Sequence, residues 1–154
     1  VILFQTLQIV ILYKKLVMKI VLKANKQPEG LFNDFREFDL DDLILMPSNE
    51  WLKDKMDKFD YWTSFEKHGM IYPITVSPHT EKWLQERLQR GKTPQHLYVN
   101  GDVRPGLYVQ TGNKRVYWAR EKGYTHIEGY YVTNLQDKAT IRNKLHIPHT
   151  EIPK

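Results

Sequence analysis

The chain has 154 residues, the usual size of one domain or of one domain with an appendage. With 41% hydrophobic residues it can bury a core, so we expect the bulk of the chain to be folded. A net charge of +5 favours polyanionic partners such as nucleotides or nucleic acid, although an ordinary basic protein has the same balance. Cysteine is absent, which excludes disulfides, thiolate metal sites and a cysteine nucleophile, and fits a cytoplasmic protein.

Residues 1–17 are mostly apolar and end in a pair of lysines followed by Leu16 and Val17. The apolar run is shorter than the roughly 20 residues that a membrane-spanning helix needs, and two glutamines interrupt it. A secretory signal carries its positive charge before the apolar run rather than after it. We therefore expect no membrane partner and interpret residues 1–17 as a non-native or loosely attached leader. The alternative is an extra strand or helix packed on the domain.

The first half of the domain, which we place at residues 18–145, begins with a short strand at residues 19–22. Residues 31–46 predict a loop and one short strand that ends at Pro47. Ser48 is typical of a helix N-cap, and hydrophobic residues then recur at steps of three or four up to Gly69. This pattern predicts a helix with a kink near Asp60. A strand at residues 74–76 is expected directly after Pro73.

In the second half, Thr80 can cap a helix that Gly91 ends. Residues 97–100 and 107–110 flank a turn-rich segment and predict a hairpin with a wide loop. A helix at residues 113–122 and a strand at residues 127–132 follow. Residues 134–145 are compatible with a helix, and residues 146–154 are expected to be a loose tail. This mixture of elements predicts an α/β (α+β mixed) domain.

The most informative segment is the strand, glycine turn and helix of residues 111–122. The first N–H groups of a helix lack intrahelical partners and carry the positive end of its dipole, so such an end binds phosphate readily. Gly112 lets the backbone approach closely, while Lys114 and Arg115 add positive charge that opposes the dipole unless an anion is present. The alternative is an ordinary surface turn with two solvated cations. We expect replacement of both cations by alanine to abolish anion binding and to leave the fold intact.

Two segments resemble, in order, the N-terminal domain of the ParB/sulfiredoxin superfamily. Residues 68–76 (HGMIYPITV) are similar to the family's helix end, glycine and P-I-x-V strand, and residues 111–115 (TGNKR) resemble its G-E-R-R or G-H-R box. The resemblance covers residues 40–132, with residues 78–106 as an insertion between the two motifs. It implies a small mixed sheet flanked by helices, with an inserted helix and hairpin.

The resemblance also implies a nucleotide site for a nucleoside triphosphate, CTP or ATP, with Mg²⁺. The residues that would hold the phosphates are Gly112, Asn113, Lys114 and Arg115. Those that would line the base or ribose are Gly69, Tyr72, Pro73 and Ile74, although Ile74 fits an ordinary core strand equally well. Further candidates near this site are His68, Thr111 and Arg104.

Departures from the family limit the chemistry that the resemblance implies. Asn113 stands where many relatives carry an acid, which puts nucleotide hydrolysis in doubt. Sulfiredoxin chemistry needs a cysteine and is excluded. No metal site is predicted, since Pro148 separates His146 from His149, and the acidic residues 39–42 fit a solvated loop.

The leading functional hypothesis is a ParB-like nucleotide-binding domain that acts in the DNA metabolism of a virus, plasmid or bacterium. One alternative is a nuclease or phosphoryl-transfer enzyme on the same fold, for which the sequence offers no convincing set of carboxylates. The other is a module that binds DNA or a protein without nucleotide. The sequence leaves open which nucleotide binds and what the oligomeric state is.

Overall fold

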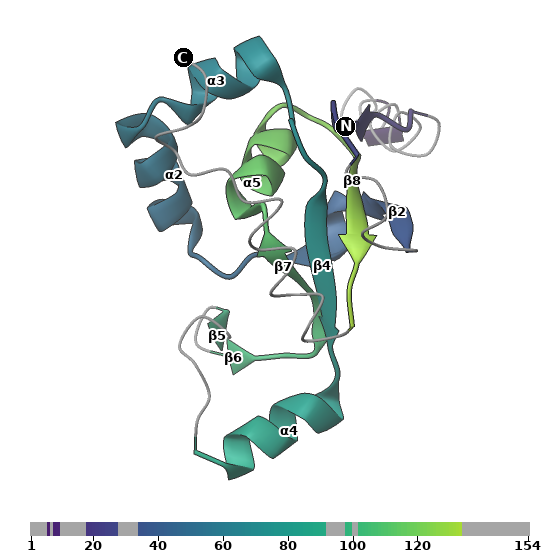
Figure 1. The fold of residues 1–154 in the computed structure, drawn as a ribbon, viewed down its shortest axis with the longest axis vertical. Helices are drawn as coiled ribbons and strands as arrows, with labels where there is room; N and C mark the ends of the chain where they lie inside the picture. Colours follow the sequence, from purple (N-terminus) through teal and green to yellow (C-terminus); the bar gives the residue numbers. More distant parts are fainter. Residues whose placement is uncertain are drawn as a thin grey trace.

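The computed structural model describes residues 18–27, 34–91, 98–99 and 102–133, together with Thr6, Gln8 and Ile9. Its centre is a six-stranded mixed sheet, with helices α2, α3 and α5 gathered beside it (Figure 1). This architecture confirms the α/β class. The rest of the expected leader, the helix expected at residues 134–145 and the tail at residues 146–154 lie outside the described residues.

The sheet has the strand order β1-β8-β4-β7-β3, and β2 pairs with β8 from the other side. β8 is parallel to β1 and β4 and antiparallel to β2, while β7 is antiparallel to β4 and parallel to β3. The strands are β1 (Val21–Leu22), β2 (Phe35–Asp39), β3 (Leu43–Ile44), β4 (Ile74–His79), β7 (Gly106–Thr111) and β8 (His126–Tyr131). The segment expected to hold one strand thus supplies both β2 and β3, with the 3-10 turn Leu40–Asp42 between them.

The hairpin predicted from residues 97–100 and 107–110 is wrong. Instead, β5 (Tyr98–Val99) pairs with β6 (Asp102–Val103) in a separate two-stranded sheet, and β7 pairs inside the main sheet. Burial favours this arrangement, because Tyr108 and Val109 point to opposite faces of the sheet and both are fully buried, as in a strand that is covered on both faces. The strand expected at residues 74–76 continues as β4 through Pro78, at a level where β8 no longer pairs with it.

Local sequence signals account for the helix boundaries. Ser48 Oγ accepts a hydrogen bond from the Trp51 N–H (3.1 Å) at the start of α2 (Asn49–Lys58). Thr80 Oγ1 accepts from the Trp83 N–H (3.2 Å) at the start of α4 (Glu81–Gln89). Asp60 has a left-handed backbone (φ 50°), so the kink expected there is a complete break between α2 and α3 (Tyr61–His68).

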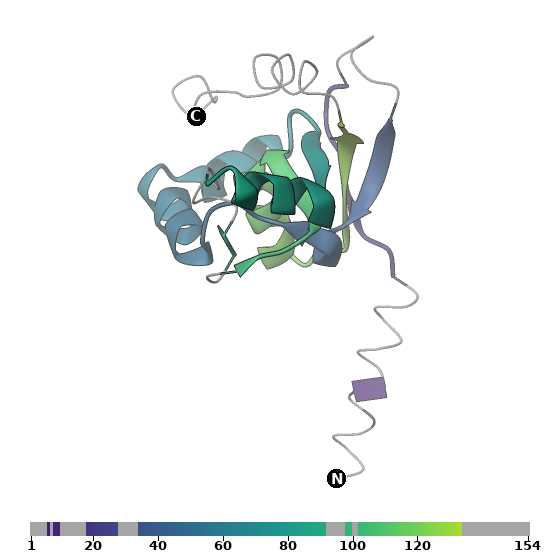
Figure 2. The same cartoon turned by 90° about the horizontal axis from the view of Figure 1, so that it is seen from below.

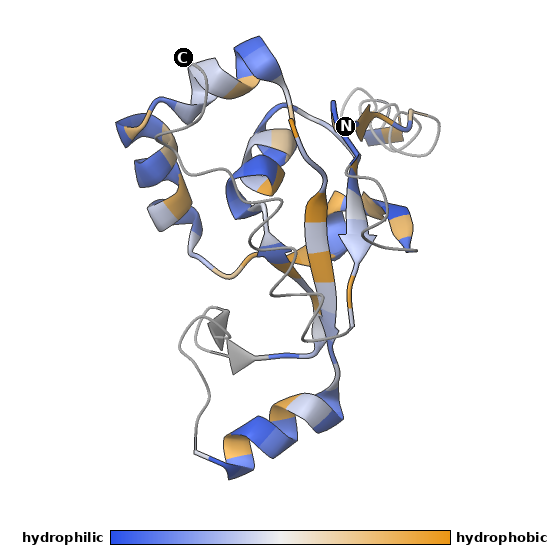
Figure 3. Cartoon of the chain, viewed as in Figure 1, coloured by the Kyte–Doolittle hydropathy of each residue, from blue (hydrophilic) through white to orange (hydrophobic). Residues whose placement is uncertain are grey.

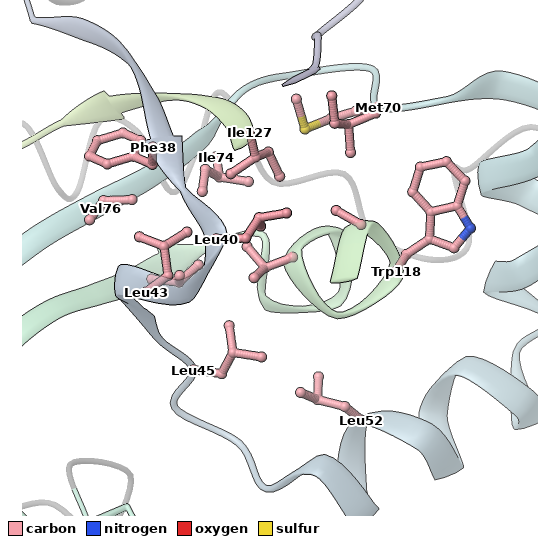
Figure 4. Close-up of a cluster of buried hydrophobic side chains, with 14 of the residues drawn as sticks. Phe38, Leu40, Leu43, Leu45, Leu52, Met70, Ile74, Val76, Trp118 and Ile127 are labelled. Atoms are coloured by element: carbon pink, nitrogen blue, oxygen red, sulfur yellow. The ribbon is translucent and has the colours of Figure 1, made fainter. Parts of the chain in front are cut away.

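The main core lies between one face of the sheet and three helices. Helix α5 (Asn113–Glu121) packs on the sheet, and α2 and α3 lie on the side of α5 that faces away from the sheet (Figure 1). Figure 4 shows Ile74, Val76 and Ile127 from the sheet, Trp118 from α5 and Leu52 from α2 around this core. Along β4, apolar and polar residues alternate (Figure 3), so one face of the strand joins this core and the other carries Thr75 and Ser77.

Helix α4 covers the end of the opposite face, at a distance from α2 and α3 (Figures 1 and 2). There the His79 ring is stacked between Trp83 and Tyr108, at 4.2 and 4.3 Å between ring centroids. Among the described helices, none has the length and apolar content that a membrane crossing requires.

Candidate anion site at the start of helix α5

Strand β7 ends at Thr111, Gly112 makes the turn, and α5 begins at Asn113, so the predicted strand–turn–helix is confirmed. Gly112 has a φ of 99°, which favours glycine. A Cβ at this position would lie 2.6 Å from Ile74 Cγ2, so the absent side chain makes room for the protein core rather than for a ligand. Gly112 stands at the N-cap position and has no side chain with which to cap the first N–H groups of the helix.

Arg115 joins the two segments on which the family resemblance depends. Its Nη1 donates to the carbonyl oxygens of Tyr72 (2.7 Å) and Pro73 (3.0 Å). Burial of the guanidinium lowers the pKa of Arg115 to about 10. The structure therefore brings the segments 68–76 and 111–115 together, and it gives Arg115 backbone partners where a phosphate was expected.

Asn113 also has internal partners. Its Oδ1 accepts from the Met46 N–H (3.1 Å), and its Nδ2 donates to the Val109 carbonyl (3.3 Å). The side chain thus fixes the segment after β3 to the start of α5. An acid here would lose the donor to Val109, which gives a structural reason for an amide at this position.

Lys114 is the cation whose environment fits an anion site. Its Nζ lies 4.8 Å from the ring centroid of Tyr61 and 5.7 Å from that of Trp51. Burial lowers the pKa of Lys114, and the positive charges of Lys55 and Arg115 lower it further. None of the ion pairs among the described residues involves Lys114. A half-buried ammonium group beside two other cations is a place where an anion would relieve repulsion.

The residues expected on the base side have mostly structural roles. Gly69 ends α3 with a left-handed φ of 65°. Tyr72 packs against Tyr130 and Val132, and Ile74 is fully buried in the main core. The Pro73 carbonyl, to which Arg115 donates, and the Ile74 side chain place this segment beside the turn at Gly112.

The further candidates lie in different places. Thr111 is buried and its Oγ1 lies 2.7 Å from Thr75 Oγ1, directly before the turn. The His68 carbonyl accepts from Asn25 Nδ2 (2.6 Å), and His68 Nε2 is buried without a hydrogen-bond partner among the described residues. Arg104 precedes β7, whereas α5 follows the other end of that strand, so the structure does not bring Arg104 to the site.

A pocket of about 610 Å³ lies at the opposite end of α5. It is bounded by β1 and by the ends of α3 and α5, and Gly69 is the only candidate residue among those that line it. The large pocket therefore does not coincide with the turn at Gly112.

In the described part of the chain, no group of three His, Asp or Glu residues is placed so that it could hold a metal ion. Asp39 Oδ1 accepts from the Asp41 N–H (2.9 Å), so the acidic segment forms a capped turn. His146 and His149 lie outside the described residues.

Sequence reasoning missed the neighbours of Lys114 that come from other elements, namely Trp51, Lys55 and Tyr61. These three residues stand outside the hydrophobic stripe from which the helix was predicted, and no local signal connects them with residue 114. Only the packing of α2 and α3 beside α5 brings them together.

The chain matches no family model, no curated protein and no solved structure. What the structure defines is a mixed α/β domain with a six-stranded sheet and an uncapped, lysine-bearing helix start at the end of a central strand.

Proposed function

We propose that this chain is a ParB-like domain that binds the phosphates of a nucleotide at the start of α5 and acts in DNA metabolism, in a viral, plasmid or bacterial setting. The observation that carries the proposal is the position of Lys114, a half-buried cation without an ion-pair partner among the described residues, beside an uncapped helix start. The adjacency of the segments around Pro73 and Gly112 supports it, since the resemblance expects both at one site.

The ligand contacts follow from what remains accessible. The first backbone N–H groups of α5 and the Lys114 ammonium suit the phosphates of CTP or ATP. Arg115 and Asn113 would act indirectly, because their side chains hold the carbonyls of Tyr72 and Val109 and thereby fix the turn. Mg²⁺ would be held mainly by the nucleotide's phosphates and by water, because such sites use only one or two protein carboxylates.

Isothermal titration with CTP, ATP and GTP tests the proposal. We expect one nucleotide to bind, and Lys114→Met to weaken binding roughly 10- to 100-fold, as loss of a charge-assisted contact does. Lys53→Met is the matched control, because Lys53 is an exposed lysine on α2 for which no ion pair is found among the described residues. Absence of heat with all three nucleotides, or equal binding by both variants, would refute the proposal.

A further inference from the structure

Cations and aromatic rings alternate along one side of α2 and form a continuous series. Lys114 Nζ lies 5.7 Å from the Trp51 ring centroid, and Lys55 Nζ lies 5.5 Å from Trp51 and 5.6 Å from Phe59. Lys58 Nζ lies 5.6 Å from Phe59 at the other end. We call this series, from Lys114 to Lys58, the α2 strip.

The two rings of the α2 strip are accessible to a partner. Trp51 is 45% exposed and Phe59 is 40% exposed, although large aromatic residues are usually well buried. The core does not need these rings, because α2 contributes Leu52 and Met56 to it and both are fully buried. Trp51 therefore presents apolar ring surface to the outside, and the exposed part of Phe59 extends it, while the Phe59 ring also meets that of Tyr61 at 6.1 Å between centroids.

The lysines of the strip carry unneutralised charge. Lys55, Lys58 and Lys114 take part in none of the ion pairs found among the described residues. The acids of α2 stand at positions 50, 54 and 57, each one residue before a member of the strip, which displaces them by about 100° around the helix. Most of this acidic side lies away from Leu52 and Met56. Asp54 also stands four residues before Lys58, but none of these acids forms an ion pair with a lysine of the strip among the described residues.

We infer that the α2 strip binds single-stranded nucleic acid, with bases stacked on Trp51 and Phe59 and phosphates beside the lysines. Aromatic faces interleaved with cations are the chemistry that single strands select, whereas a duplex keeps its base faces stacked inside. The eight helical steps from Trp51 to Phe59 span about 12 Å along the helix axis, compared with a rise of about 3.4 Å per nucleotide in a stacked strand. A bound strand would therefore be extended, and the two bases that stack on Trp51 and Phe59 would not stack on each other.

Fluorescence anisotropy with a labelled dT oligonucleotide of about 12 nucleotides tests the inference, and an rU oligonucleotide of equal length separates DNA from RNA. We expect binding that weakens with salt, as contacts between lysines and phosphates do. Trp51→Leu should weaken it roughly 5- to 100-fold, since it removes the ring but keeps apolar contact, and Trp51→Phe should retain most of the affinity. Lys55→Ala with Lys58→Ala should reduce both the affinity and its salt dependence.

Two control variants remove similar groups elsewhere. Leu88→Ala takes away an exposed apolar side chain on α4, which is 51% exposed, and Lys53→Ala with Lys82→Ala takes away two exposed lysines outside the strip. Both should bind the oligonucleotide within about twofold of the unaltered protein. Far-UV circular dichroism checks that each variant is folded.

The inference is overturned if the protein does not bind the oligonucleotide, if Trp51→Leu binds it as the unaltered protein does, or if a duplex or poly-glutamate binds equally well. The strip shares Lys114 with the proposed nucleotide site, so the variants used here leave residues 112–115 unaltered. Titration of Trp51→Leu with mononucleotide distinguishes binding at the strip from binding at the proposed nucleotide site. If that variant loses mononucleotide and oligonucleotide binding to the same degree, Trp51 belongs to the nucleotide site and the strand inference is wrong.

Discussion

The guanidinium of Arg115 lies 2.7 Å from the carbonyl oxygen of Tyr72, which stands 43 residues earlier in the chain. This contact, with the second one to Pro73, ties the first turn of α5 to the segment before β4. A buried guanidinium is stable only where its N–H groups have acceptors, and backbone carbonyls provide them here. The pairing converts two separate sequence motifs into one structural unit.

Arg115→Met is expected to lower the free energy of unfolding by about 1–3 kcal/mol, because two carbonyl oxygens lose their donor. We expected from the sequence that Lys114 and Arg115 could both be replaced without loss of stability. The contacts of Arg115 restrict that expectation to Lys114. Urea unfolding followed by circular dichroism measures the change. Arg90→Met, at an exposed position after α4, is the control and should stay within about 0.5 kcal/mol. Equal midpoints for both variants would contradict a structural role for Arg115.

Lys114→Met should stabilise the protein at about pH 7.5, by less than about 1 kcal/mol because the group is partly solvated. The pKa of Lys114 is lowered from 10.5 by burial and by neighbouring cations, so the folded state binds this proton less tightly than the unfolded chain. Its cost is full below the lowered pKa and is relieved as pH rises toward 10.5. The gain from the substitution should therefore shrink in that range. Urea unfolding of both proteins at about pH 7.5 and at a pH near 10.5 tests this. A stability gain that grows with pH would contradict the prediction.

Gly112→Ala is expected to destabilise the fold by at least about 2 kcal/mol, because its φ of 99° adds strain and its Cβ would lie 2.6 Å from Ile74 Cγ2. Gly123→Ala separates these causes, since Gly123 has a φ of 85° but nothing within 4 Å of the added carbon. That control should cost about 1 kcal/mol. Thermal or urea unfolding of both variants gives the difference, and equal losses would mean that the contact with Ile74 is unimportant.

Thr75→Val should cost about 1–3 kcal/mol, because Thr75 is fully buried and its Oγ1 accepts from the Thr111 N–H (3.1 Å). Valine keeps the shape but leaves that N–H without its acceptor. Faster hydrogen exchange at the Thr111 amide should accompany the loss of stability. Thr133→Val, at an exposed position, serves as the comparison. Unchanged exchange at Thr111 would argue against this hydrogen bond.

Much of the local structure was predictable from short stretches of sequence. The caps at Ser48 and Thr80, the break at Asp60 and the glycine turn at Gly112 all appear where the residues indicate them. Each depends on one side chain and the backbone within a few residues of it. The pairing of β7 was not predictable in this way, since a short apolar strand does not specify its partner.

The sequence by itself therefore determined where helices begin and end, the mixed α/β class, and the presence of two cations after a glycine. Only the tertiary structure decided that Arg115 is committed to the carbonyls of Tyr72 and Pro73, while Lys114 faces Tyr61 and Trp51 and pairs with no carboxylate in the described part of the chain. The physical reason is that capping and turn formation are local. The partner of a charge, and its exposure to water, depend on which distant segments pack beside it.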